Sequence, residues 1–269
     1  MKNERTEALT IVPFAPMILT FHRVSHNFTW SATNYRPERI ISLLTQLESA
    51  GFVFIPLSDE ISSKPAGERH LAITFDDGMA ELADELPPLI DRFGLKPTVF
   101  MPTAFIGRTN RWDYSYRLAP SRHLNRDEIS RLADAGVEFG SHGHTHRCFR
   151  NLPVDVVADE LRQSRTILEE ILGKTVDSIS YPFGRIDDTL LKLVAEAGYT
   201  HGYTMRYPAF DDRPLALGRM AVYSFDNPAS VQRKLGSGFG HRIERVIAAF
   251  TNRLSGGTVL LQRFRSFHL

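Results

Sequence analysis

Cysteine is almost absent from this 269-residue chain: Cys148 is the single one, so no disulfide can form within the chain. Long apolar runs are missing as well, since no stretch approaches the roughly 18 apolar residues that a membrane-spanning helix needs. Residues 1–10 are polar and charged, and they lack the apolar core of a secretory signal. These absences predict a cytoplasmic protein.

An excess of charge of one sign is also missing. The formal net charge is +1, which gives no general reason to expect nucleic acid as a partner. The composition is otherwise ordinary, with 42% hydrophobic residues, and 269 residues suffice for one large α/β domain with a substantial core. No internal repeat, low-complexity tract or clear linker divides the chain.

Short apolar runs alternate with amphipathic stretches along most of the chain. The runs are almost entirely apolar, which is typical of strands buried on both faces of a parallel sheet. We therefore expect an α/β fold, a single distorted (β/α) barrel with about seven parallel strands. The expected strands are 16–22, 52–55, 71–75, 97–101, 137–139, 178–181, 199–204 and one within 215–223. The expected helices are 37–50, 81–93 (kinked or split by Pro87-Pro88), 126–135, 153–172 and 186–197.

The barrel domain is expected to span residues 16–225. Residues 1–15 then form an N-terminal extension, and residues 226–269 form a basic, helical C-terminal extension. Within the latter, residues 243–254 place apolar side chains on one helical face and basic side chains opposite. We expect this helix to pack on the barrel flank, and a peripheral contact with an anionic membrane surface is the alternative.

Polar residues follow the ends of two predicted strands. Residues 74–78 (TFDDG) place two adjacent carboxylates after one strand, and residues 141–146 (SHGHTH) place two imidazoles four residues apart after another. In a parallel barrel the carboxyl ends of the strands meet on the face where chemistry takes place. One carboxylate and two neutral imidazoles suit a divalent metal with open positions for water and substrate. The other carboxylate is a candidate base, so the segments predict metal-assisted hydrolysis.

Each segment also has a purely structural interpretation. Asp-Asp-Gly is a common turn composition, and the histidines of residues 141–146 could belong to a polar loop. Metal sites draw their ligands from separate elements, and here both segments follow strands. We therefore favour the metal site.

The two segments resemble signature motifs of the polysaccharide deacetylases of the NodB-homology class, carbohydrate esterase family 4. By this resemblance Asp76 is the catalytic base, and Asp77, His142 and His146 are the metal ligands. The resemblance covers about residues 16–223 and implies removal of N-acetyl groups from N-acetylglucosamine units of an oligo- or polysaccharide. It implies a divalent metal, zinc first, although such a ligand set also accepts cobalt, nickel, manganese or ferrous iron.

A third segment, residues 180–184 (SYPFG), resembles the Arg-Pro-Pro-Tyr-Gly motif of the family. By this resemblance the backbone N–H of Phe183 helps to hold the oxyanion, and its ring lines the acetyl-binding groove. Tyr181 and Pro182 are expected to contact substrate. The chain departs from the motif at Ser180 and Phe183, but a backbone donor survives both changes. The departures therefore bear on substrate binding rather than on the chemistry.

The family also supplies a histidine from a late Leu-x-x-His motif, which protonates the leaving amine. No such motif occurs late in this chain, but residues 19–22 (LTFH) match it near the N-terminus. This order resembles the circularly permuted exopolysaccharide and biofilm deacetylases, and a parallel barrel tolerates a strand that enters from either end of the chain. We expect His22 to be the general acid, and a structural histidine that ends a buried strand is the alternative.

Two further parts of the sequence hold candidates for substrate binding. Trp112, with Tyr114 and Tyr116, lies in a polar aromatic loop where rings could stack on sugars. Arg219 follows an apolar run. A contact with Asp76, where a cation would keep the base ionised, and an ordinary surface position are both open for Arg219.

Three alternative functions stay open. One is deacylation of a lipid-linked or small amide, as by the deformylase of lipid-linked aminoarabinose, which is similar to this family. Another is hydrolysis of a cyclic amide on the same scaffold. The last is carbohydrate binding without turnover, although binding alone needs no base beside a metal. A cytoplasmic deacetylase would meet its substrate before export, so we expect a short or lipid-linked exopolysaccharide precursor. The oligomeric state is left open.

Overall fold

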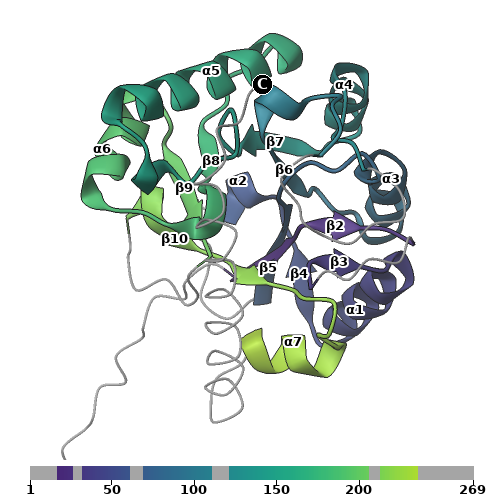
Figure 1. Ribbon diagram of the computed structural model, residues 1–269. Coiled ribbons are helices and arrows are strands. Elements are labelled where there is room, and N and C mark those ends of the chain that lie inside the picture. The colour runs from purple at the N-terminus through teal and green to yellow at the C-terminus, as the bar shows by residue number, and fades with distance from the viewer. Residues whose placement is uncertain (1–16, 27–31, 61–68, 111–120, 206–212, 236–269) are drawn as a thin grey trace, which may run out of the picture.

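The computed structural model describes residues 17–26, 32–60, 69–110, 121–205 and 213–235 (Figure 1). A parallel sheet curls around the centre of the molecule, and helices cover its outer face. The strands are β1 (Met17–Phe21), β4 (Phe52–Phe54), β5 (Arg69–Phe75), β6 (Thr98–Met101), β7 (Glu138–Ser141), β8 (Ser178–Ser180), β9 (His201–Thr204), β10 (Leu217–Gly218) and β11 (Met220–Ala221). The helices are α1 (Pro37–Ser49), α2 (Leu57–Glu60), α3 (Leu82–Phe93), α4 (Arg126–Asp134), α5 (Val154–Leu172), α6 (Asp188–Glu196) and α7 (Pro228–Leu235). A separate pair joins β2 (Arg23–Val24) to β3 (Asn34–Tyr35).

The order of the strands closes the sheet into a barrel. It runs β10-β9-β8-β7-β6-β5-β1-β11, with every pair parallel and with β4 attached to β5 outside this path. The two ends of the path, β10 and β11, are separated in sequence by Arg219 alone. The N–H of Arg219 donates to the carbonyl of Thr204 on one side, and the N–H of Val222 donates to that of Thr20 on the other. The predicted distorted (β/α) barrel is confirmed, and its last strand is broken at Arg219.

The interior of the barrel is apolar at one end and polar at the other. The apolar end consists of Ile18, Leu57, Ala72, Phe100 and Tyr203, of which Leu57 belongs to α2. Because side chains alternate along a strand, the next inward positions of β1 and β5 lie one level higher. These positions are threonines, Thr20 and Thr74, whose hydroxyl oxygens are 2.8 Å apart. Polar side chains therefore lie directly below the carboxyl ends of the strands.

Helix α3 differs from its prediction. It runs unbroken from Leu82 to Phe93 with Pro87 and Pro88 inside it, so of the two predicted outcomes, a kink or a split, the split does not occur. Each proline removes a backbone hydrogen bond, but one face of the helix is buried, and tertiary packing supplies most of the stability of such a helix. The short elements α2, β2 and β3 were not expected either, since two to four residues carry no periodic signal.

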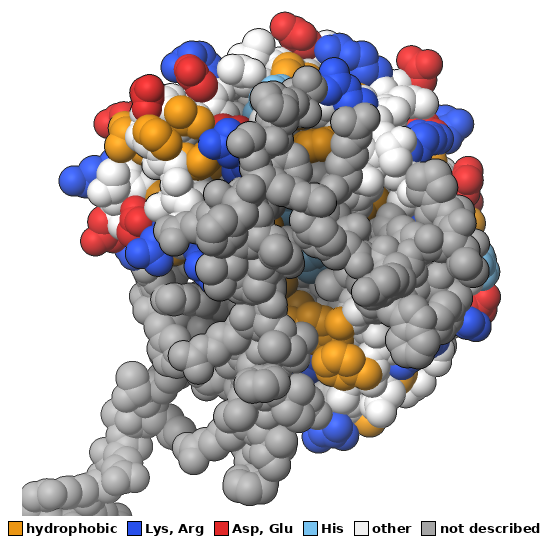
Figure 2. Space-filling model, viewed as in Figure 1, with side chains coloured by type: hydrophobic (Ala, Val, Ile, Leu, Met, Phe, Trp, Pro, Cys, Tyr) orange, Lys and Arg blue, Asp and Glu red, His pale blue; other side chains and the backbone are white. Residues whose placement is uncertain are grey.

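Charged side chains of both signs surround the part of the barrel that the structure describes (Figure 2). None of the described helices is both long enough and apolar enough to cross a bilayer. Figure 2 shows Lys and Arg side chains interspersed with Asp and Glu around the rim of the visible face. Helix α7 packs against α1, and its Lys234 is buried in an ion pair with Asp226. The expected helix at residues 243–254 and the extension 1–15 lie outside the described residues.

Candidate active site

Unusual backbone conformations gather at the carboxyl ends of the strands. Among the described residues, the ones other than glycine that have positive φ are Asp77 (69°), His146 (55°) and Phe183 (63°). Each belongs to one of the three sequence motifs, and the left-handed region is costly for side chains of this size. Gly78 follows at 54°, where a Cβ would lie 1.8 Å from the sulfur of Met101. The strain is thus stored where the motifs meet.

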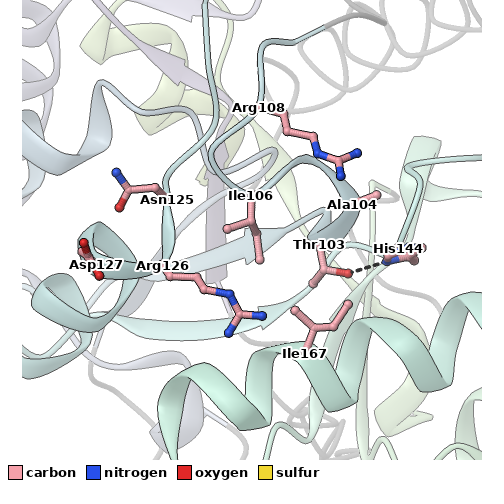
Figure 3. Close-up of a pocket in the computed structure, with 9 residues that line it drawn as sticks. All are labelled: Thr103, Ala104, Ile106, Arg108, Asn125, Arg126, Asp127, His144 and Ile167. Atoms are coloured by element: carbon pink, nitrogen blue, oxygen red, sulfur yellow. Dashed lines mark hydrogen bonds between the residues drawn. The ribbon is translucent and has the colours of Figure 1, made fainter. Parts of the chain in front are cut away.

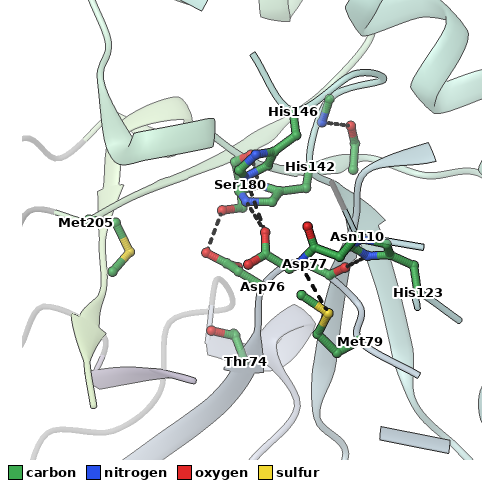
Figure 4. Close-up of polar contacts among 12 residues, drawn as sticks. Thr74, Asp76, Asp77, Met79, Asn110, His123, His142, His146, Ser180 and Met205 are labelled. Carbon is green, nitrogen blue, oxygen red and sulfur yellow. Dashed lines mark hydrogen bonds and ion pairs between the residues drawn. The ribbon is translucent and has the colours of Figure 1, made fainter. Parts of the chain in front are cut away.

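Three predicted metal ligands come together from two strand ends. One ligand atom from each of Asp77, His142 and His146 lies within 4.8 Å of the other two. Asp77 Oδ1 is 3.2 Å from Nε2 of His146 and 3.7 Å from Nε2 of His142, and Figure 4 shows both rings facing the carboxylate. A carboxylate and two imidazoles on one side of a site suit a divalent cation and leave positions open for other ligands. This donor set fits the expected metal.

The tautomer of His142 is set by its surroundings. Its Nδ1 lies 2.7 Å from the carbonyl oxygen of Ser180, so Nδ1 carries the proton and Nε2 presents its lone pair to the site. Burial lowers the pKa of His142 to about 4, despite the nearby carboxylates. The ring is therefore neutral near pH 7, which is the form that binds a metal.

Asp76, the predicted base, lies in a buried ion pair with Arg219. The two guanidinium NH2 groups donate to the two carboxylate oxygens at 2.8 Å each, and the Arg219 side chain is 0% exposed. Burial alone would raise the pKa of Asp76, but Arg219, together with His142 and His22, outweighs burial and lowers this pKa to about 2. Ser180 donates to Asp76 and accepts from Arg219, so the guanidinium from the β10–β11 junction reaches the first residue of the 180–184 motif.

Of the two positions left open for Arg219, the structure shows the contact with Asp76, and it gives no support to a role in binding substrate. Its guanidinium is committed to Asp76, Ser180 and Thr74. Tyr181 is likewise corrected: its ring is buried in the main core, and its hydroxyl donates to the carbonyl of Leu215. Pro182 is buried as well, and Trp112 lies outside the described residues.

The Asp76–Arg219 pair predicts a loss of stability in acid. Because the pKa of Asp76 falls from 3.8 to about 2 on folding, its contribution is complete above the unfolded value and is lost as the pH falls through the folded one. We expect the difference in unfolding free energy between the wild type and Asp76→Asn to shrink across this window. Urea unfolding at several pH values measures it, and a difference that stays constant would contradict the pairing.

His22 and Phe183 lie beside Asp76 and the predicted metal ligands. The N–H of Asp76 donates to the carbonyl of Phe21 at 2.9 Å, so His22 lies beside Asp76 at the end of β1. His22 is half-buried, and its Nδ1 is a buried atom with no hydrogen-bond partner in the described part of the chain. Phe183 is half-buried, with its ring 5.2 Å from that of His146. The structure thus brings both residues to the site where they were expected.

His123 was missed by the sequence analysis. It is fully buried, and its Nδ1 lies 2.7 Å from the backbone carbonyl of Asp77, next to Met79 and Asn110 (Figure 4). An N–H donor at this carbonyl supports the left-handed backbone of a metal ligand. Nothing in the sequence around residue 123 marks it, because its partner is a main-chain atom from a distant segment.

His144 lies between the two ligands in sequence, and its ring points away from the site. Its Nδ1 is 2.9 Å from the hydroxyl of Thr103, and both residues line a pocket of about 810 Å³ on the other side of the histidine segment. Figure 3 shows this pocket with Arg108 and Arg126 at its edges. The N–H groups of Thr103 and Ala104 donate to the carbonyls of residues 143 and 144, so the pocket wall and the histidine segment are one connected structure.

Comparison with known proteins agrees with this geometry. A family model described as polysaccharide deacetylase matches residues 63–202, more than half of the chain. The poly-beta-1,6-N-acetyl-D-glucosamine N-deacetylase of Staphylococcus epidermidis is 24% identical over 168 residues, which is 58% of this chain and 56% of that protein. The enzyme of the same name from Staphylococcus aureus is 22% identical over 62% of this chain and 60% of its own length. The chain thus spans between half and two thirds of these curated relatives.

Solved structures share the fold. The deacetylase PplD of Streptococcus pyogenes superposes with a TM-score of 0.71 at 18% identity, over 84% of this chain and all of that one. IcaB from Ammonifex degensii gives a TM-score of 0.66 at 19% identity, over 77% of this chain and 91% of that one. With the family model covering more than half of its length, this protein belongs to the polysaccharide deacetylase family.

Proposed function

We propose that this protein is a metal-dependent hydrolase that removes N-acetyl groups from N-acetylglucosamine units of an exopolysaccharide. One observation carries the proposal: three metal-binding side chains lie within 4.8 Å of one another beside a carboxylate that Arg219 keeps ionised. The names of the staphylococcal relatives, which are N-deacetylases of poly-beta-1,6-N-acetyl-D-glucosamine, support this choice of substrate. The expectation that the protein acts in the cytoplasm, on a short or lipid-linked precursor, stays a prediction.

Each residue has a distinct role in this reaction. A divalent metal held by Asp77, His142 and His146 would make a water more acidic and polarise the acetamide carbonyl. Asp76 accepts the proton of the attacking water while the C–O bond forms. The N–H of Phe183 donates to the developing oxyanion. The C–N bond then breaks, the departing nitrogen takes a proton from His22, and the products are acetate and a free amine.

Replacement of His22 tests the role of the acid. His22→Asn should lower kcat by about 10²–10⁴, the range that general acid–base catalysis contributes, because the amine must then leave without its proton donor. Metal affinity should not change, since His22 is not among the three ligands. Steady-state kinetics and a metal titration measure the two quantities. A wild-type kcat in this variant would show that His22 is not the general acid and has only a structural role at the end of β1.

The substrate is tested with defined oligomers. The metal-loaded protein is incubated with β-1,6-linked and β-1,4-linked oligomers of N-acetylglucosamine, and free amines are counted by mass spectrometry. The proposal predicts amines in the β-1,6-linked oligomers. Turnover of the β-1,4-linked oligomers alone would support the deacetylase reaction but would show that the substrate is a β-1,4-linked polymer. No turnover of either, with metal bound, would favour the lipid-linked or small-amide alternatives.

A further inference from the structure

Glu160 on α5 is a buried carboxylate to which the mechanism gives no role. Only 5% of the residue is exposed, and no basic side chain pairs with it among the described ion pairs. Its partners lie instead in the segment between the two metal-binding histidines. Glu160 Oε2 accepts the backbone N–H groups of His144 and Thr145 at 2.9 and 2.8 Å, and Oε1 accepts the hydroxyl of Thr145.

A hydrogen bond from Gly143 completes this arrangement. The N–H of Gly143 donates to the hydroxyl oxygen of Ser141 at 3.1 Å. Every backbone N–H between His142 and His146 is therefore accepted by a side-chain oxygen rather than by a helix or a strand. Hydrogen bonds to a charged acceptor are about twice as strong as neutral ones, so Glu160 is the main acceptor of the segment.

The support for this segment comes from one face of α5. Glu160 and Ser164 are four residues apart and therefore lie one above the other on the helix. The hydroxyl oxygen of Ser164 is 2.8 Å from that of Ser141 and 3.0 Å from that of Tyr199. Glu160 and Ser164, on one face of α5, thus bind both ends of the segment 141–145 that leads to His146. Helix α5 itself contributes no metal ligand.

We propose that Glu160 is a positioning residue for the metal site, which fixes the two histidines at their binding separation before the metal arrives. His146 has a φ of 55°, in the left-handed region that residues other than glycine adopt uncommonly and that neighbouring contacts must stabilise. A carboxylate that accepts the two preceding N–H groups supplies such enforcement. A loop ordered in advance does not lose conformational entropy on binding, so the metal binds more tightly. The inference rests on the metal site of the proposed function.

Glu160→Gln tests this role with little change of shape. The amide offers one acceptor oxygen in place of two and turns its NH2 toward a donor. The metal affinity should fall by about 10–100-fold, the loss typical of residues that orient metal ligands. Competition with a chromophoric chelator measures the affinity for zinc and cobalt, and the visible absorption of the cobalt form reports the ligand geometry. Thr145→Val removes only one hydroxyl contact and should give a smaller loss in the same direction.

Glu169→Gln is the matched control. Glu169 lies on the same helix and also accepts a backbone N–H, that of Val176 at 3.1 Å, but far from the histidine segment. Both glutamine variants should lower the unfolding temperature of the metal-free protein, and only Glu160→Gln should change metal affinity and the cobalt spectrum. Wild-type affinity in Glu160→Gln, or an equal loss in Glu169→Gln, would overturn the role of Glu160. A wild-type protein that binds no metal would overturn the proposed function itself.

Discussion

Replacing Asp76 by asparagine is expected to abolish deacetylation while leaving the metal site intact. Asparagine keeps the size of the side chain but cannot accept the proton of the attacking water. Loss of a general base costs about 10²–10⁴ in rate. Asp77, His142 and His146 are untouched, so affinity for the metal should stay at the wild-type value. Turnover assays and a metal titration on the same preparation measure both effects.

The same substitution also leaves Arg219 without its partner. Removing one member of a buried ion pair destabilises a protein by roughly 3–5 kcal/mol, because the remaining charge stays buried. Circular dichroism at the assay temperature must therefore show that Asp76→Asn is folded before its activity is judged. Ser180→Ala is a useful control, since it removes one hydrogen bond to Asp76 but keeps the ion pair. Near-normal turnover by folded Asp76→Asn would show that another group is the base.

Replacing His142 by alanine is expected to remove both metal and activity. His142 supplies one of three ligands, and its ring is held by the carbonyl of Ser180. The loss of affinity should exceed the roughly 10–100-fold that removal of an outer partner costs. Metal content after dialysis and the rate of acetate release measure the two effects. The third histidine of residues 141–146, His144, is not among the three ligands, so its replacement gives a comparison within the same motif.

His144→Ala is the matched control for that experiment. His144 lies two residues away, is half-buried, and directs its ring to Thr103 on the far side of the loop. Its removal should leave the ligands in place and the metal bound. Wild-type metal content in His142→Ala, or an equal loss in His144→Ala, would contradict the assignment of ligands.

Much of this site could be predicted because its residues are local in sequence. Each motif follows a strand, and strands of a parallel barrel end on one face, so Asp77, His142 and His146 were expected together and are found together. The placement of His22 also followed from pattern, since β1 pairs with β5 and brings residue 22 beside Asp76. The apolar character of the strands was enough to indicate the barrel.

The residues that were missed or misjudged act through distant partners. The sequence left open whether Arg219 contacts Asp76 or lies on the surface. Only the break between β10 and β11 places it inside the barrel against Asp76. His123 and Glu160 bind main-chain atoms of the metal-binding segments. A main-chain partner is the same for every residue type, so the sequence does not indicate such a contact. Tyr181 was misjudged because a motif position does not tell on which side of the backbone a ring packs. Long-range packing decides each of these cases.

The most direct test is acetate release from short N-acetylglucosamine oligomers by protein stripped with a chelator and then reloaded with zinc or cobalt. The account predicts no acetate from the stripped protein and recovery of release on reloading, because Asp77, His142 and His146 bind a metal that the reaction needs. Equal acetate release from the stripped and reloaded protein would contradict it. So would the absence of acetate from protein in which bound metal has been confirmed.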